Sequence, residues 1–566
     1  MSSSIQHPSL SRRTFLARTS LTAAGLALGA RRLSGSGITG VRDARRIPAN
    51  MSPAMCFAAP RSPAVLQALA TQAMDAATQA GATYADIRVG EYQAILMTDQ
   101  FGTELSDGFG YGVRAYVDGG WAFVHGTAPT PDAVVAAARG AVAQARRNAA
   151  VVRTSASSVA RRSSAPAAAD FAQPPVVKGE WAVPVAIDPF AVPIQDQMAL
   201  LVSWSATSHR HWSAYMFGML MWRRETRVFA ASTGSLVIQH LMGSRSERLV
   251  CASGRTGGYN DPQVMTPRTV PGSGGYELVA DPAFYDEIMI AADQALSYAA
   301  LPTGKMDVGR YPVVFDGATF GAALYPNLGQ ALELDRVLGE EADGAGTSLF
   351  APPLELLGTV VTSPALTVTA GRALPDFTSV KWDDDGVQAR TVPVITAGRL
   401  VDYQTSMRTV PALAPWYQRE GRPVQSVGAA VAPEADQPVQ VRCGHLTAAP
   451  ASTTVSLDDL IRDISHGLLV RGGGYPATDQ QLSSSSLGDT GMFFEVSRGR
   501  VVRRLFGNGL QWSTQPFWKA LTAVGDASTV GSWNNEASKG QPWHSMVYTT
   551  SAPAGHFKAI DVISLR

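Results

Sequence analysis

The sequence has few cysteines and few charged side chains for its length. Its three cysteines, Cys56, Cys251 and Cys443, stand far apart, without the close pairing of a metal site or a redox motif, so at most one intrachain disulfide can form. Charged residues make up 16% of the 566 positions, and the formal net charge is +1. A nucleic-acid-binding protein needs a clustered basic face, and this balance gives no electrostatic argument for one.

Long apolar runs are also absent. No stretch approaches the roughly 20 apolar residues that a membrane-spanning helix needs. With 45% hydrophobic residues the composition is compatible with a folded globular protein, and the length suffices for two to four domains. A G-x-S-x-G nucleophile elbow is missing as well. A Ser-His-Asp triad stays possible, because its members need not be close in sequence.

The first thirty residues form a separate segment. It carries, in order, paired arginines, a phenylalanine and a leucine, a short apolar run and a basic flank: Arg12-Arg13, Phe15-Leu16, 21–28 and Arg31-Arg32. These features are typical of a twin-arginine export signal. We therefore expect residues 1–30 to be a signal peptide, and the mature protein to be periplasmic or extracellular, with no membrane span after signal removal.

Three regions of different composition follow the signal. Residues 31–61 are rich in glycine, serine, proline and arginine, which predicts a flexible linker. Residues 62–300 mix helical and strand periodicities, with an Ala/Ser/Pro-rich segment, 152–175, that we expect to be mobile. Residues 301–566 are β-rich, with short apolar runs between glycine, proline and aspartate. The elements expected in the first of these domains are helices near 63–80, 131–147, 188–208 and 282–298, strands near 84–89, 225–231 and 236–241, and a hairpin over 113–124.

The chain is organised around residues 313–339. An apolar strand, 313–315, is followed by the turn Asp316-Gly317 and by a helical pattern in which Leu324, Leu328 and Ala331 share one face. The letters at the end of this pattern, in the one-letter code, are GQALELD.

This stretch resembles the signature helix of the TldD/PmbA family of metallopeptidases, which are sometimes labelled modulators of DNA gyrase. In that family the helix reads roughly His-Glu-x-x-x-His-Ala-Leu-Glu-x-Asp, so that two histidines bind zinc and the glutamate polarises a zinc-bound water. The phrases ADIRV, GYGVRAYVDGGWAFV and TPDAVVAAARGAVAQAR follow one another as in the N-terminal domain of the same family. The resemblance implies an α+β fold of two domains, an N-terminal helix/antiparallel-sheet domain and a β-rich C-terminal domain.

The zinc motif itself is degenerate. In register with the family, the first histidine position is Tyr325, the glutamate position is Pro326, and the second histidine position is Gln330. Family members take a third ligand from a cysteine near the C-terminus, and counting back from Gly540 places Glu536 there. Proline has no side-chain base, and a phenol and a neutral amide are poor zinc ligands beside imidazole or thiolate. We therefore expect no zinc and no other bound cofactor, although the family uses zinc.

Two acidic groups remain near the motif. Glu333 and Asp335 match the family, and we expect them to be exposed, as charged residues at a helix end commonly are. The segment Trp382-Asp383-Asp384-Asp385-Gly386 resembles an Asp-Asp-Glu-Gly segment of the family. Adjacent carboxylates can bind calcium, but we expect a solvated turn whose carboxylates cap backbone amides and serve as scaffold.

These observations lead to three hypotheses about function. The first is an exported metallopeptidase homologue that has lost its zinc ligands and acts as a non-catalytic subunit or peptide-binding partner in the proteolysis of unfolded peptides. The resemblance implies a dimer, in which a zinc-bearing TldD-like homologue is the expected partner. The second keeps peptidase activity at a non-zinc or rearranged site, with Glu333, Glu536 and His544 as first candidates. The third is a homodimeric periplasmic peptide-binding protein. Whether the chain is an enzyme stays open.

Overall fold

The computed structural model describes residues 42–43, 51–98, 102–159, 171–208, 214–252, 264–373, 378–488, 490–540 and 542–565. The expected signal peptide, 1–30, and most of the expected linker lie outside these residues. Within the described part of the chain, no helix combines the length and the apolar character needed to span a membrane.

An eight-stranded sheet forms the N-terminal half. Its strand order is β1-β3-β2-β6-β7-β5, with β4 beside β3 and β8 beside β7. The predicted strands lie inside longer ones. The bounds are β1 Arg42–Asp43, β2 Tyr84–Thr98, β3 Gly102–Val117, β4 Gly120–Gly126, β5 Lys178–Ala182, β6 Ala214–Ala231, β7 Leu236–Ala252 and β8 Val264–Ser273.

Helices cover one face of this sheet in two groups. Leu66 of α2 (Pro63–Gln79) and Val142 of α3 (Pro131–Val159) belong to the same core as Val89 of the sheet. The helix α4 (Ile194–Ser208) packs on the other end of the same face, where Trp204 and Trp222 share a core. The helices α5 (Glu277–Ala280) and α6 (Pro282–Ala299) follow β8. The described structure corrects two expectations: α3 runs through residues 152–159 of the expected mobile segment, and the end of the expected linker is folded.

That folded end is the short 3₁₀ turn η2 (Pro53–Cys56). The backbone N–H of Ala54 donates to the carbonyl of Phe190 at 2.9 Å, and Phe57 packs against the core that contains α4. Residues 51–57 are therefore part of the N-terminal half.

Two further sheets build the C-terminal half. Their orders are β18-β19-β22-β26-β10-β17-β20-β21-β9, with β23 beside β26, and β13-β12-β11-β16-β25-β24; β14 and β15 pair separately. The bounds are β9 Thr303–Gly304, β10 Gly309–Phe315, β11 Val368–Gly371, β12 Thr391–Thr396, β13 Arg399–Leu400, β14 Ala430–Val431, β15 Gln440–Val441, β16 His445–Ala448, β17 His466–Arg471, β18 Ala477–Thr478, β19 Ser484–Leu487, β20 Met492–Ser497, β21 Arg500–Leu505, β22 Asn508–Ser513, β23 Leu521–Val524, β24 Gly531–Lys539, β25 His544–Ala552 and β26 Gly555–Ser564. Short helices connect them: α9 Pro353–Leu356, η5 Val410–Leu413, α10 Ala414–Arg419, α11 Leu457–Arg462, α12 Thr514–Lys519 and η6 Ala527–Thr529.

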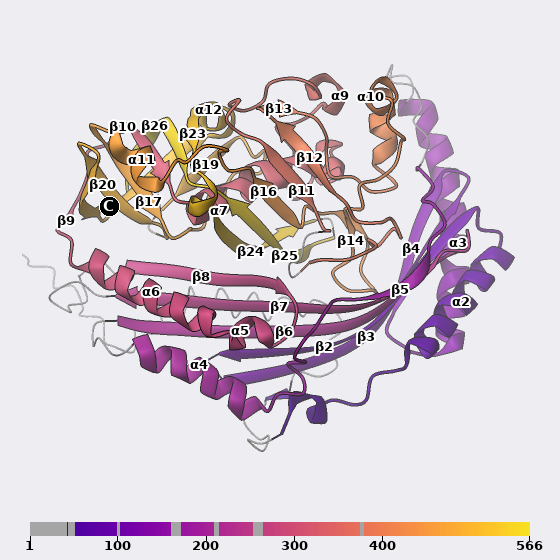
Figure 1. Cartoon of the computed structure of the whole chain (residues 1–566). Coiled ribbons are helices and arrows are strands. Elements are labelled where there is room, and N and C mark those ends of the chain that lie inside the picture. The colour runs from indigo at the N-terminus through magenta and orange to yellow at the C-terminus, as the bar shows by residue number, and fades with distance from the viewer. Residues whose placement is uncertain are drawn as a thin grey trace, which may run out of the picture.

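Among the described residues, no strand of the first half pairs with a strand of the second. Figure 1 shows the long strands β6, β7 and β8 passing beneath the C-terminal half, with α4, α5 and α6 on the side away from it. The sheet curves around the C-terminal half toward α2 and α3. The α+β fold of a helix-covered antiparallel sheet and a β-rich second half is therefore the one that the sequence predicted.

The turn at residues 382–386 joins the two halves. The predicted capping is confirmed, since the Asp383 carboxylate accepts from the backbone N–H of Asp385 and of Val387, at 3.0 and 2.8 Å. The predicted exposure to solvent is wrong: Asp383, Asp384 and Asp385 are 2%, 5% and 1% exposed. Arginines of the N-terminal sheet reach Asp384 and Asp385, whereas the Asp383 carboxylate is satisfied by backbone N–H groups.

Arg227 of β6 forms one of these contacts. Its Nη1 donates to Asp384 Oδ1 at 2.9 Å and to the carbonyl of Ala432 at 2.8 Å, while its Nε donates to Glu225 Oε1 at 2.6 Å. All of these groups are buried. A buried ion pair is costly to break from one side, because the remaining charge is left without a partner.

Other arginines extend this network. Arg114 of β3 lies 2.8 Å from Asp385 Oδ1 and forms a two-pronged contact with Asp86. Arg223 donates two hydrogen bonds to the carboxylate of Glu434, at 2.9 and 2.8 Å. Several desolvated charges on the sheet are thus neutralised by the C-terminal half, so the two halves are expected to hold one fixed arrangement.

The first prediction follows from this network. Arg227→Met keeps an unbranched apolar stem but leaves Asp384 and Glu225 without their shared cation, and we expect the free energy of unfolding to fall by about 3–5 kcal/mol. Arg310→Met is the matched control, because Arg310 and Asp561 form an exposed pair, 68% and 54% exposed, worth about 0–1 kcal/mol. Thermal unfolding of both variants checks this, and equal melting temperatures would contradict a buried clamp.

Candidate functional site

The segment that carries the degenerate motif begins as predicted. The Asp316 carboxylate accepts from the Thr319 N–H at 2.8 Å and caps α7 (Gly317–Leu324). The predicted regular helix ends there, and a π-helical turn, η3 (Tyr325–Gly329), is followed by the 3₁₀ turn η4 (Gln330–Leu332) and by α8 (Leu334–Val337). Pro326 has no N–H to donate, and the Gln330 N–H bonds to the Tyr325 carbonyl, five residues back.

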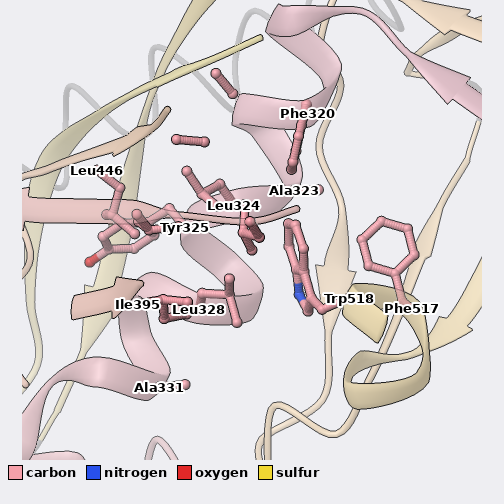
Figure 2. Packing of buried hydrophobic residues seen from close by; sticks show 14 of the residues in the cluster. Phe320, Ala323, Leu324, Tyr325, Leu328, Ala331, Ile395, Leu446, Phe517 and Trp518 are labelled. Carbon is pink, nitrogen blue, oxygen red and sulfur yellow. The ribbon is translucent and has the colours of Figure 1, made fainter. Parts of the chain in front are cut away.

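The apolar side of this segment is buried, as its periodicity predicted. Leu324, Leu328 and Ala331 are at most 1% exposed. Figure 2 shows them in one cluster with Ile395 and Leu446, which come from the six-stranded sheet. Because this packing fixes the helical segment, the orientation of its polar side is fixed as well.

Tyr325 fills the first histidine position with a buried phenol. Its ring stacks on Tyr548 of β25, with ring centroids 3.7 Å apart and an angle of 8° between the planes. Its hydroxyl donates to Glu333 Oε1 at 3.0 Å. Burial raises the pKa of Tyr325 well above its usual value. The phenol therefore keeps its proton and shares it with a carboxylate.

The other positions of the motif do not converge on Tyr325. Pro326 and Gln330 are half-buried. In the β24–β25 pair, Tyr548 lies directly opposite Asn535, so these two side chains share one face of the sheet and Glu536 points to the other. Glu536, which the sequence places at the third ligand position, therefore lies on the face opposite to that of Tyr548.

A buried lysine, which the motif did not indicate, lies beside the retained acids. Lys539 Nζ is 3.0 Å from Glu333 Oε2, 2.8 Å from Asp335 Oδ1 and 2.8 Å from Glu341 Oε1. It also donates to the Val441 carbonyl at 2.9 Å. The expectation that Glu333 and Asp335 are exposed is wrong, because they are 0% and 5% exposed. The only sequence signal was Lys539 beside the family-like Gly540-Gln541.

Backbone groups complete the partners of the two retained acids. Glu333 Oε1 accepts from the Cys443 N–H at 3.0 Å, and Asp335 Oδ2 accepts from the Val441 N–H at 2.8 Å. Asp335 Oδ1 accepts from the Arg336 N–H at 2.8 Å. These contacts fix the segment from Val441 to Cys443 to the end of the motif segment, which gives both acids a structural role.

The residues at the motif do not fit a zinc ion. Tyr325 donates its proton to Glu333, proline has no donor atom, and Gln330 offers a neutral amide, which is a weak ligand beside imidazole or thiolate. Glu333, Asp335 and Glu341 offer carboxylate oxygens within 4.8 Å of one another, a spacing that suits a metal ion. The Lys539 ammonium, however, already lies within 3.0 Å of all three.

The remaining candidates lie elsewhere. His544 begins β25, opposite Lys539, and its side chain is outside the described part of the structure. Trp543 beside it is 58% exposed, whereas three other tryptophans belong to the core, Trp512, Trp518 and Trp533. Cys443 is buried and forms no disulfide with Cys56.

The fold and the degenerate motif together define a metallopeptidase-like protein of two halves. Two family models match the chain: "PmbA/TldA metallopeptidase domain 1" over residues 102–149 and "PmbA/TldA metallopeptidase C-terminal domain" over residues 308–562, together more than half of the chain. The chain belongs to this TldD/PmbA family. A curated relative from Methanothermobacter thermautotrophicus, described as a metalloprotease, is 23% identical over 262 residues. This match covers 46% of the chain and about half, 52%, of the relative's length.

Solved structures share the fold. A protein described as a modulator of DNA gyrase from Thermotoga maritima has a TM-score of 0.64 at 13% identity, over 88% of this chain and 99% of that one. TldE from Thermococcus kodakarensis has a TM-score of 0.60 at 14% identity, over 88% and 100%. A second protein described as a gyrase modulator, from Bacteroides thetaiotaomicron, reaches 0.58 at 15% identity, over 88% and 98%.

The second prediction concerns the lysine cluster. Burial, only partly offset by Lys539, raises the pKa of Glu341 from 4.5 to about 7, and Asp335 and Glu333 add to the rise. Between these values the folded chain binds more protons than the unfolded chain, so the contribution of Glu341 to stability falls as the pH rises through this window. As the pH rises from about 4.5 to 8, the free energy of unfolding of Glu341→Gln is expected to increase relative to that of the wild type by up to about 3 kcal/mol.

Unfolding midpoints of the wild type and of Glu341→Gln, measured across that range, check this expectation. Glu355→Gln, at an exposed position on α9, is the control for loss of one negative charge. Parallel profiles for the wild type and Glu341→Gln would mean that the lysine neutralises Glu341 fully.

Proposed function

We propose that this chain is an exported TldD/PmbA-family subunit that has no zinc site and contributes peptide-binding surface to the proteolysis of unfolded peptides. The observation that carries the proposal is the contact of Tyr325 with Glu333 and of Glu333 with Lys539. A phenol and an ammonium group satisfy the carboxylate beside the motif, and no imidazole or thiolate stands at the ligand positions.

The intact core supports a functional subunit rather than a homologue that has lost its function. The packing of α7, the buried acids and the interdomain arginine network are all complete. Each would cost several kcal/mol if it were partly lost. A chain with this core intact and without zinc ligands is suited to a partnership in which a zinc-bearing homologue supplies the chemistry, as the resemblance to the family implies.

Export is the second element of the proposal. It rests on the arginine pair Arg12-Arg13 and the apolar run after it. Because twin-arginine export carries folded proteins, a dimer that forms before export fits this route. The homodimeric peptide-binding protein is the competing hypothesis, and it differs from the subunit only in the partner.

The third prediction is the metal content. Elemental analysis of the full chain, purified without chelators and again after a zinc soak, is expected to give close to zero zinc per chain. A zinc metallopeptidase purified in parallel is the control. One tightly bound zinc per chain would overturn the proposal and favour a rearranged zinc site.

The fourth prediction is the partner. Co-expression with a zinc-bearing homologue of the family is expected to give a complex of one chain of each, seen by size-exclusion chromatography with light scattering. A homodimer that binds unfolded peptides saturably, without turnover and without the homologue, would support the competing hypothesis. A monomer that takes up neither partner nor peptide would contradict both.

A further inference from the structure

A pocket lies on the helix-covered face of the N-terminal sheet, far in sequence from the degenerate motif. Its volume is about 200 Å³. On β2, Val89 packs in the core of α2 and α3 and Ile95 in the core of α4, and the pocket residues Glu91 and Gln93 lie between them. The pocket therefore occupies the gap between the two groups of helices.

Three polar side chains form a hydrogen-bonded chain at this pocket. Thr226 Oγ1 of β6 and His240 Nδ1 of β7 are 3.2 Å apart, and both residues line the pocket. His240 Nε2 lies 2.8 Å from Glu180 Oε1 of the neighbouring strand β5. Because a carboxylate only accepts, Nε2 carries the ring proton, and Nδ1 is left to accept from the threonine hydroxyl.

Hydroxyl, imidazole and carboxylate in this order are the arrangement that activates a hydroxyl nucleophile. Here the two ring nitrogens exchange the roles that they have in the serine proteases. A second threonine–histidine pair in the described part of the chain lacks the carboxylate, so the series of hydroxyl, imidazole and carboxylate is not found at every such pair. Thr522 Oγ1 lies 2.7 Å from His556 Nδ1, but His556 Nε2 has no partner among the described residues, and the pair is outside this pocket.

The surroundings of Thr226 suit an acyl group. Arg224 lies two residues earlier on the same strand face, and its guanidinium lies over the Phe190 ring, 4.2 Å from the ring centroid. Its hydrogen bonds in the described chain, two to Gln93 Oε1 and one to Asp188, occupy three of its five N–H groups. It can therefore donate to an oxyanion. Val183 and Met242 provide apolar lining. Drug-sized ligands occupy pockets of roughly 300–1,000 Å³, so a pocket of about 200 Å³ admits only a short acyl chain.

We propose that this pocket is a second, metal-independent site, which hydrolyses short aliphatic carboxylic esters through an acyl-threonine. Thr226 Oγ1 bonds to the carbonyl carbon as its proton passes to His240 Nδ1, and the carbonyl electrons move to the oxygen, which Arg224 stabilises. The tetrahedral centre collapses, the bond to the alcohol oxygen breaks, and His240 returns the proton to the departing alcohol. Water then attacks the acyl-threonine with His240 as base, releasing the acid and restoring the hydroxyl.

This proposal does not rest on the proposed function, because every residue in it belongs to the N-terminal half. Glu180 is a positioning residue, since its side chain contacts the imidazole in the described chain and is 62% exposed. Thr226, His240 and Arg224 are the catalytic residues.

The fifth prediction is the test. The full chain is expected to hydrolyse p-nitrophenyl acetate, and Thr226→Val should lower kcat about 100-fold or more, because the base no longer has a nucleophile to activate. Thr226→Ser should keep most of the activity. Glu180→Gln should lower kcat with KM unchanged, which loss of a merely structural contact would not produce. Thr522→Val is the matched control and should not change the rate.

Mass spectrometry after a brief reaction should find one acetyl group on Thr226. Thermal unfolding of each variant separates loss of chemistry from loss of fold. Equal rates for the wild type and Thr226→Val, or acetylation of lysine or tyrosine only, would overturn the proposal. Zinc content and partner association are independent readouts, so failure here leaves the proposed function standing, and the reverse also holds.

Discussion

One ammonium group, that of Lys539, holds three buried carboxylates together, and the arrangement of the motif region depends on it. Glu333, Asp335 and Glu341 cannot stay in the core alone, because an unpaired buried ion costs several kcal/mol. Pairing brings the end of the motif segment and strand β24, about 200 residues apart in sequence, to one place. The acids retained from the family therefore hold the fold together, and the phenol of Tyr325 completes the partners of Glu333.

The same constraint joins the two halves of the molecule. Arginines on the concave side of the N-terminal sheet meet the acidic turn at residues 382–386, and both sets of charges are buried. Separating the two halves would break these ion pairs and leave the charges that stay buried without partners. Buried ion pairs thus stabilise both the motif region and the contact between the two halves.

The chain therefore presents two polar sites of different character. At the motif, every donor and acceptor of Glu333 and Lys539 is satisfied inside the protein, which favours rigidity over reaction. At the pocket of Thr226 and His240, the polar chain ends at a threonine that lines the pocket, and Arg224 lines the same pocket. A charged network closed on itself stabilises a fold, whereas one that ends at a pocket can act on a ligand.

The sequence by itself determined the family, the α+β class, the two halves and the buried face of the motif segment, because these are local patterns of residue type and spacing. Only the tertiary structure decided that Glu333, Asp335 and the acidic turn are buried, that Glu536 faces away from Tyr325, and that Thr226, His240 and Glu180 meet. A charged residue in the sequence is compatible both with a solvated turn and with a buried ion pair, and only its partner distinguishes the two. Packing between distant segments decides which charged groups become partners. It also decides which face of a sheet a strand residue occupies.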